Sequence, residues 1–218
     1  RGVVQMAQHF IFDFDGVLSN SLRVACEEVN RLREIRFPNL PKVFSQYDMS
    51  LLFCGPLRTS LRRFGLTDAD SREFFDLHSA AMLRRSGDVS PFESVLDVVK
   101  TVAFGRATIV TSSYSDAAHR ILARSEIYEP GIFSAILGRE MRKPKSEKIA
   151  DALRAAGVSV NDAIHVGDTV SDLLYSRDVS IPFCAVGWGY HPLGYLRSFD
   201  PDHSAEKPDD LKLVLQST

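Results

Sequence analysis

Short apolar runs alternate along this chain with longer segments in which apolar residues recur every three or four positions. The short runs predict strands, at Gln8–Phe12, Ala107–Thr111, Ala135–Leu137, Ala163–Gly167 and Pro182–Val186. The longer segments predict helices, at Phe92–Val102, Ser115–Arg124, Ser146–Ala156, Thr169–Ser176 and Pro208–Leu215. Strands that alternate with helices are typical of βαβ units around a parallel sheet. We therefore expect an α/β fold with a doubly wound, Rossmann-like parallel sheet.

The interval between the first two predicted strands is much longer than the others. Roughly 95 residues separate Asp15 from Thr111, whereas a crossover connection needs only a dozen or so. Three segments within this interval carry apolar residues at helical spacing: Leu22–Arg36, Leu57–Phe64 and Asp68–Arg85. We interpret residues 21–88 as an inserted helical cap subdomain, and residues 1–20 plus 89–218 as the α/β core.

Polar side chains follow four of the predicted strands. In open α/β sheets, ligands bind beyond the carboxyl ends of the strands, so these side chains are expected to share one site. They are Asp13 and Asp15 after the first strand, Thr111 to Ser113 after the second, Lys143 after the third, and Asp168 and Asp172 after the fourth. Two carboxylates at the mouth of a buried strand repel each other and are costly to desolvate. The pattern therefore predicts a bound cation.

These residue types together suit phosphoryl transfer. Mg²⁺ prefers oxygen ligands and binds few carboxylates. Asp13, held beside Mg²⁺ and a lysine ammonium, can attack phosphorus as a nucleophile and form an aspartyl-phosphate, and Asp15 can act as the general acid and base. The Thr111 strand end and the Lys143 ammonium can stabilise the charge on the transferred phosphoryl group. Lys145, two residues further on, is an alternative to Lys143 for this role.

The four groups stand in the order of the four motifs of the haloacid dehalogenase superfamily of phosphohydrolases, which the chain resembles over nearly its whole length. They are "DFDGV", the strand end at Thr111, the lysine of "KP", and "GDTVSD". The resemblance implies that Asp13, Asp168 and the backbone carbonyl of Asp15 bind Mg²⁺. It implies that Asp172 supports the metal or ligates it, and that the insertion is the family's helical cap.

Within that superfamily the chain is similar to phosphoglycolate phosphatase and its relatives, through "GLTDADSREFF", "GDVSPFESVLDVV" and "VGWGYHPLGYL". The resemblance to the superfamily as a whole implies that Thr111 and Ser112 hold the phosphate, and that Lys143 pairs with both the phosphate and Asp13. Many relatives have Asp where Asn20 stands, and a different residue soon after the threonine of the second motif. These departures leave the mechanism intact and the substrate open.

Arg58 is the candidate for the substrate's remote end. Gly55 and Pro56 precede a predicted helix start, where free N–H groups favour an anion. Arg58 lies in the first turn of that helix and can bind a carboxylate or a second phosphate with its planar fork. The segment resembles the cap loop of β-phosphoglucomutases that faces the active site. The alternative is a solvated arginine on an exposed helix.

We therefore expect a Mg²⁺-dependent phosphatase that acts on a small phosphorylated metabolite, such as phosphoglycolate or a sugar phosphate. A phosphomutase of the β-phosphoglucomutase type would use the same aspartates and a similar cap, and the sequence does not decide between the two. A dehalogenase is disfavoured because it needs no acid–base group at Asp15 and no Mg²⁺. A non-enzymatic receiver-like phosphoacceptor module is disfavoured because it lacks a large cap and carries its phospho-accepting aspartate on a middle strand.

The composition indicates which classes of partner to expect and in which compartment the protein works. Charged residues make up 25% of the 218, and the net charge of −2 gives no reason to expect nucleic acid or an anionic membrane as a partner. No apolar run approaches the roughly 20 residues of a membrane span. Cys26, Cys54 and Cys184 are widely spaced, as reduced thiols of a cytoplasmic protein would be. We expect a cytoplasmic monomer that binds a small phosphate ester.

Overall fold

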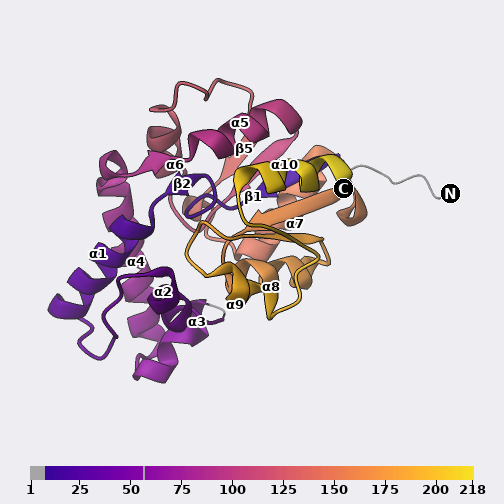
Figure 1. Cartoon of the computed structure of the whole chain (residues 1–218). Helices are drawn as coiled ribbons and strands as arrows, with labels where there is room; N and C mark the ends of the chain where they lie inside the picture. Colours follow the sequence, from indigo (N-terminus) through magenta and orange to yellow (C-terminus); the bar gives the residue numbers. More distant parts are fainter. Residues whose placement is uncertain (1–7, 56) are drawn as a thin grey trace.

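The computed structural model describes residues 8–55 and 57–218, and for residues 57 and 58 it describes the backbone alone. The centre of the protein is a six-stranded parallel sheet (Figure 1). The strand order is β5-β4-β1-β6-β7-β8. The strands are β1 (His9–Phe12), β4 (Ala107–Val110), β5 (Phe133–Leu137), β6 (Ala163–Gly167), β7 (Phe183–Val186) and β8 (His203–Ala205). The chain moves from β1 outward to β4 and β5, and then returns to the other side of β1 with β6. The strand order therefore reverses at β1, where ligands of doubly wound sheets bind.

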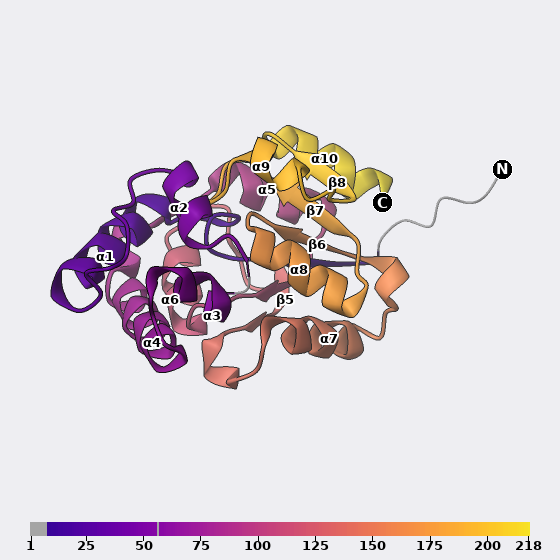
Figure 2. The same cartoon turned by 90° about the horizontal axis from the view of Figure 1, so that it is seen from below.

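Helices cover both faces of this sheet. α5 (Glu93–Val102) and α10 (Pro208–Ser217) pack on one face, and α7 (Lys145–Ala156) and α8 (Val170–Val179) pack on the other (Figure 2). The other two helices that the structure describes after residue 91 are α6 (Ser115–Leu122) and α9 (Leu193–Arg197). Short 3₁₀ turns lie at Leu61–Phe64, Ser86–Asp88, Arg139–Met141 and Val160–Asp162. The expected α/β fold with a doubly wound sheet is confirmed.

The apolar side chains of β1 pack into the hydrophobic layers on both faces of the sheet. All four of its residues are buried, as expected for the central strand of a parallel sheet. Because side chains alternate along a strand, Phe10 and Phe12 point into the layer that contains α5 and α10. Ile11 points the other way and packs with Ile149 and Leu153 of α7. This burial fixes the register of β1, and therefore fixes where Asp13 leaves the sheet.

A group of four helices lies to one side of the sheet, at the left of Figures 1 and 2. It consists of α1 (Leu22–Ile35), α2 (Gln46–Leu52), α3 (Leu57–Ser60) and α4 (Asp68–Arg84). Its centre is aromatic, with the Phe74 ring in contact with Phe37, Phe53 and Phe75. The chain enters and leaves this group through a short antiparallel pair, β2 (Ser19–Asn20) with β3 (Ser90–Pro91). We call α1 to α4 the helical group.

Three sets of polar contacts hold the helical group against the rest of the protein. Gln46 Nε2 of α2 donates to the carbonyls of Gly187 and Gly189, at 3.1 and 2.7 Å. Ser171 Oγ donates to the carbonyl of Gly55 at 2.7 Å. Asp76 of α4 forms an ion pair with Arg139, which follows β5. These contacts come after different strands, so they hold the group over the carboxyl ends of the sheet.

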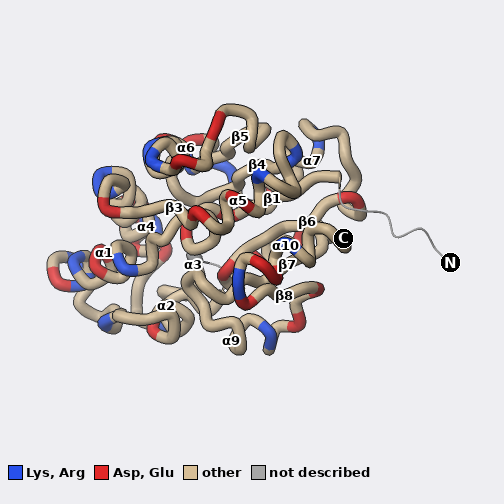
Figure 3. The backbone as a smooth tube through the Cα atoms, turned by 45° about the horizontal axis from the view of Figure 1, so that its top comes forward, with Lys and Arg blue, Asp and Glu red and all other residues tan. Residues whose placement is uncertain are grey.

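Basic and acidic residues are interspersed along the chain, on the helical group as well as around the sheet (Figure 3). The near balance of charge in the composition is therefore also present in each part of the molecule. None of the helices in the described ranges combines the length and the apolar character that crossing a bilayer requires.

The five expected strands are all present, within two residues of their predicted bounds. Five strands and helices were not predicted: β2, β3, β8, α2 and α9. The sequence of β8 is only "HSA", which has no apolar run, and it is a strand because it pairs with β7. The predicted helix Leu57–Phe64 is α3 followed by a 3₁₀ turn.

Candidate active site

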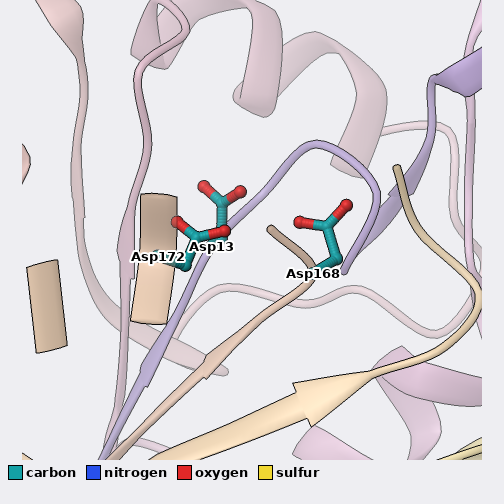
Figure 4. A group of neighbouring side chains, drawn as sticks. All are labelled: Asp13, Asp168 and Asp172. Carbon is teal, nitrogen blue, oxygen red and sulfur yellow. The ribbon is translucent and has the colours of Figure 1, made fainter. Parts of the chain in front are cut away.

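Three carboxylates converge at the carboxyl ends of β1 and β6 (Figure 4). Asp13 follows β1 and Asp168 follows β6, and the two are brought together because Phe12 pairs with Val166 in the sheet. Asp172 comes from the first turn of α8, where it forms a capping box with Thr169. One carboxylate oxygen of each residue lies within 4.8 Å of the others. Three of the four expected metal-binding aspartates therefore share one site.

Asp168 lies in a closely fitted pocket of backbone. Its Oδ2 accepts a hydrogen bond from the Tyr190 backbone N–H at 2.6 Å. Gly16, at φ +82°, and Gly189 approach so closely that a Cβ on either would overlap the Asp168 carboxylate. Its Oδ1 is buried and has no hydrogen-bond partner among the described residues. A buried, unpartnered carboxylate oxygen is costly, and a bound cation would satisfy it.

Lys145 carries the ammonium of the site. Its Nζ lies 2.7 Å from Asp13 Oδ1 and 2.5 Å from Asp172 Oδ1, and the residue is only 6% exposed. Burial opposes the charge of Lys145, but the two carboxylates outweigh it and raise its pKa. Lys145 is the first residue of α7, and helical side chains point back toward the N-terminus of their helix. Its ammonium is therefore directed at the strand ends.

The expected contact of Lys143 with Asp13 is not present. The Lys143 Nζ lies 2.6 Å from Asp151 on α7, and its side chain is largely exposed. Pro144 stands between the two lysines as the N-cap of α7, so Lys143 precedes the helix while Lys145 begins it. The alternative lysine thus occupies the position that was expected for Lys143.

Burial raises the pKa of two of the three carboxylates, and the ammonium of Lys145 lowers the pKa of the third. It raises the pKa of Asp13 to about 7, although Lys145 opposes this rise. Burial, together with the negative charges of Asp172 and Asp13, raises the pKa of Asp168 well above its usual value. For Asp172 burial acts in the same direction, but Lys145 outweighs it and the pKa is lowered. One ammonium therefore does not balance three carboxylates, and the hard oxygen donors suit Mg²⁺.

Asp15 belongs to the same site and is held separately from the three carboxylates. Its Oδ2 accepts a hydrogen bond from Ser113 Oγ at 2.6 Å, and its Oδ1 accepts one from Ser19 Oγ at 3.3 Å. Ser113 N–H in turn donates to Thr111 Oγ1 at 3.0 Å. The turn after β4 therefore fixes the Asp15 carboxyl beside the cavity that Asp13 also lines.

A second buried lysine supports this turn. Lys148 Nζ donates to the carbonyl of Thr111 and, at 3.2 Å, to the carbonyl of Gly138. It thereby joins the ends of β4 and β5. Burial, and then the charge of Lys145, lower the pKa of Lys148 to about 8. Thr111 is buried and Ser112 is exposed, and both line the cavity.

A cavity of about 950 Å³ lies between the strand ends and the helical group. The strand ends contribute Asp13, Asp15 and Asp172, together with the Thr111 turn and both buried lysines. The helical group contributes an apolar wall and polar groups around it: Phe53, Phe75 and Met82, and Arg72, Asp76, His78 and Ser79. Arg58 belongs to α3, where the structure describes its backbone and not its side chain. The predicted contact of Arg58 with the substrate therefore lies outside the described part of the protein.

Several residues of the site were not assigned a role from sequence. Lys148 could have been found from its place one turn after Lys145 on the same helix. Ser113 is adjacent to the predicted phosphate-binding residues, but its bond to Asp15 depends on the turn. Tyr190 lies within the segment "VGWGYHPLGYL" but was given no role there, and His78 lies far from the motifs, with no local signal to mark it.

Comparison with known proteins agrees with this geometry. Residues 10–186 match the model of the haloacid dehalogenase-like hydrolase family. The chain is 25% identical to the pyrophosphatase PpaX of Halalkalibacterium halodurans, over 92% of this chain and 93% of that protein. It is 27% identical to the phosphoglycolate phosphatase of Caulobacter vibrioides, over 55% of this chain and 50% of that protein.

Solved structures share the fold. A predicted phosphatase from Clostridium acetobutylicum superposes with a TM-score of 0.78 at 20% identity, covering 98% of this chain and all of that one. A hydrolase from Pseudomonas syringae superposes with a TM-score of 0.74 at 19% identity, covering 94% of this chain and 95% of that one. With the family match over most of the chain, these findings show that the protein belongs to the haloacid dehalogenase-like hydrolases.

Proposed function

We propose that the protein is a Mg²⁺-dependent phosphatase that hydrolyses a small phosphate ester through an aspartyl-phosphate on Asp13. The observation that carries this proposal is the arrangement around Asp13. A cationic Lys145 lies 2.7 Å from one of its oxygens, and the unpartnered Asp168 Oδ1 belongs to the same cluster. Burial raises the pKa of Asp13, whereas the Lys145 ammonium and a bound cation favour its ionised form, which is the form that can attack phosphorus.

The side chains divide the reaction between them. An Asp13 oxygen forms a bond to phosphorus while the bond from phosphorus to the leaving oxygen breaks, and Asp15 gives that oxygen its proton. Asp15 then takes a proton from the water that attacks the aspartyl-phosphate, which releases phosphate and restores Asp13. Thr111 and Ser112 hold the phosphoryl oxygens. Lys145, in the place expected for Lys143, neutralises their charge.

The metal would be held by Asp13 and Asp168, with the backbone carbonyl of Asp15. Both oxygens of Asp172 already have partners, Lys145 on one and Thr169 on the other, so we propose that Asp172 supports the site and orients Lys145. When bound, Mg²⁺ supplies positive charge that stabilises the phosphoryl group in the transition state.

The helical group, within the proposed boundaries of 21–88, serves as the cap over the core of residues 1–20 and 89–218. Because the phosphate is held at the strand ends, the organic part of the ester extends toward the cap wall of the cavity. Arg58 remains a candidate for the remote end of the substrate. The relatives are a pyrophosphatase and a phosphoglycolate phosphatase, and both names describe hydrolysis, which favours a phosphatase over a phosphomutase.

The test is phosphate release by the purified protein. Pyrophosphate, phosphoglycolate, sugar phosphates and an aryl phosphate are offered with Mg²⁺, with a chelator, and to the Asp13→Asn variant as control. We expect release that requires Mg²⁺ and is abolished in the variant, whose amide is nearly isosteric but cannot act as the nucleophile. Release that survives in Asp13→Asn, or in the presence of the chelator, contradicts the proposal.

A further inference from the structure

The loop between β7 and α9, residues 187–191, contacts both the carboxylate cluster and the helical group. It contributes none of the proposed catalytic side chains. Its sequence is Gly-Trp-Gly-Tyr-His; its Tyr190 lines the cavity and bonds to Asp168. We call it the bridging loop.

At one end, the bridging loop fixes a metal-binding carboxylate. The Tyr190 backbone N–H donates to Asp168 Oδ2 at 2.6 Å, and the His191 N–H donates to the Asp168 carbonyl at 3.2 Å. Gly189 packs so closely on the carboxylate that a side chain there would displace it. With Oδ2 occupied by the loop, Oδ1 is the oxygen left without a partner in the described part of the chain. The loop therefore determines which oxygen of Asp168 is presented to a cation.

At the other end, the same loop is held by the helical group. Gln46 Nε2 donates to the carbonyls of Gly187 and Gly189, at 3.1 and 2.7 Å. The Tyr190 hydroxyl and Ser21 Oγ share a hydrogen bond of 3.0 Å, and Ser21 is the N-cap of α1. The Gly189 carbonyl and the Tyr190 hydroxyl that make these bonds belong to the same two residues that contact the Asp168 carboxylate. The helical group cannot move away from the loop without breaking them.

Resting on the metal site proposed above, we propose that the bridging loop couples Mg²⁺ binding at Asp168 to the position of the cap, with Gln46 and Tyr190 as positioning residues. When Gln46 holds the loop, the Tyr190 N–H stays on Asp168 Oδ2 and Oδ1 is directed for the ion. When the cap releases the loop, Asp168 loses this orientation and binds Mg²⁺ less well. Because coupling is reciprocal, Mg²⁺ binding favours the cap position in which the loop is held.

The cap also contacts the core at residues outside the bridging loop, and two of these contacts show what loosening the cap does when the loop contacts stay in place. Ser171 bonds to the Gly55 carbonyl, and Asp76 pairs with Arg139. Ser171 is next to Asp172, so the Asp76 pair is the better control. Removing it loosens the cap at a place that has no contact with the loop or with Asp168.

The experiment measures Mg²⁺ affinity by calorimetry in the wild-type protein and in Gln46→Ala, Tyr190→Phe and Asp76→Asn. Gln46 and the Tyr190 hydroxyl are not metal ligands, yet we expect each variant to bind Mg²⁺ about fivefold or more weakly, the lower end of typical coupling between sites. Asp76→Asn leaves the contacts of Gln46 and Tyr190 with the loop in place, so it should weaken Mg²⁺ binding much less than either loop variant does. In the wild type, Mg²⁺ should also slow hydrogen exchange of the α2 amides, and this protection should be smaller in Gln46→Ala.

The outcomes separate this inference from the proposed function. A wild-type protein that binds no Mg²⁺ contradicts the metal site itself. If the wild type binds Mg²⁺ and both loop variants bind equally well, the coupling is wrong. Equal weakening in Asp76→Asn also overturns it, because general loosening of the cap would then explain the effect. Tyr190→Phe removes a single oxygen and keeps the ring, so it remains a test if Gln46→Ala does not fold.

Discussion

Lys145 Nζ lies 2.7 Å from Asp13 Oδ1, and both residues are buried. Buried ion pairs are costly to form, and they are strongly destabilising when one partner is removed. Here Asp172 lies 2.5 Å from the same ammonium, so a single lysine serves two carboxylates. This arrangement makes Lys145 the residue whose loss affects both the chemistry and the fold.

We predict that Lys145→Met lowers kcat about 10²-fold or more, the usual cost of removing one group that stabilises transition-state charge. It should also lower the free energy of unfolding, since Asp13 and Asp172 are left without their cation. Lys143→Met is the matched control, because it breaks an exposed pair with Asp151, and exposed ion pairs contribute little to stability. Steady-state kinetics and denaturant titration of both variants test this. Greater loss of activity in Lys143→Met would assign the role to Lys143 instead.

The second prediction concerns Asp168. Its carboxylate is buried among like charges and its Oδ1 has no partner in the described chain, so the amide of Asp168→Asn should raise the stability of the metal-free protein. A gain of about 1 kcal/mol would raise Tm by about 2–4 °C for a chain of this size. The rise in Tm that Mg²⁺ gives the wild type should be absent in Asp168→Asn.

Asp172→Asn is the comparison for that experiment. Asp172 pairs with Lys145 and closes the capping box of α8, so the same substitution there should lower Tm. Thermal melts of the three proteins, with and without Mg²⁺, decide the matter. A metal-free Asp168→Asn protein that melts below the wild type would contradict the account of the cluster.

The parts of this site that sequence could predict are those fixed by the sheet. The apolar run Phe10–Phe12 determines a buried central strand, and Asp13 leaves its end whatever the surrounding loops do. Asp168 follows from Ala163–Gly167 by the same argument. Strand order and register then bring the two residues together, since parallel strands present their carboxyl ends at one edge.

Strand order and register do not decide between Lys143 and Lys145. The two residues have the same chemistry, and both lie close to Pro144. What separates them is the residue at which α7 begins, because the first helical residue points its side chain back to the sheet. A sequence pattern gives the bounds of a helix least sharply, and here a shift of two residues would exchange the buried ammonium of Lys145 for the exposed one of Lys143. The bridging loop is likewise unpredictable, since its bonds to Gln46 and Asp168 are set by tertiary packing.

The third prediction tests Asp15 as the acid and base. Asp15→Asn should lower kcat by about 10²–10⁴-fold on alkyl phosphates, whose leaving oxygen needs a proton. The loss in the first step should be smaller on an aryl phosphate, whose phenolate leaves without one. Single-turnover kinetics on the two ester classes separate this step from hydrolysis of the aspartyl-phosphate. An equal loss on both classes would mean that Asp15 does not protonate the leaving group.

The last prediction is for stability in acid. His165, in the centre of β6, is fully buried; its Nδ1 is 2.6 Å from Ser176 Oγ, and its Nε2 has no partner in the described ranges. Burial, and then the charge of Lys145, lower its pKa from 6.5 to about 3. Between these two values the unfolded chain binds a proton that the folded protein does not. The free energy of unfolding therefore falls as the pH drops from about 6.5 toward 3, by up to about 1.4 kcal/mol per pH unit.

The buried carboxylates complicate the pH dependence of the wild type alone. Asp13 and Asp168 have raised pKa values, so their protonation in the folded state works in the opposite direction. His165→Gln removes only the histidine contribution, and the difference in unfolding free energy between the two proteins isolates it. We expect His165→Gln to be the less stable protein at pH 7, where its amide fits less well, and to lose less stability than the wild type down to pH 4.5. Denaturant titrations at pH 7, 5.5 and 4.5 measure this, with His119→Gln, an exposed position on α6, as control. A difference that stays constant over this range would show that His165 is protonated equally in the folded and unfolded protein.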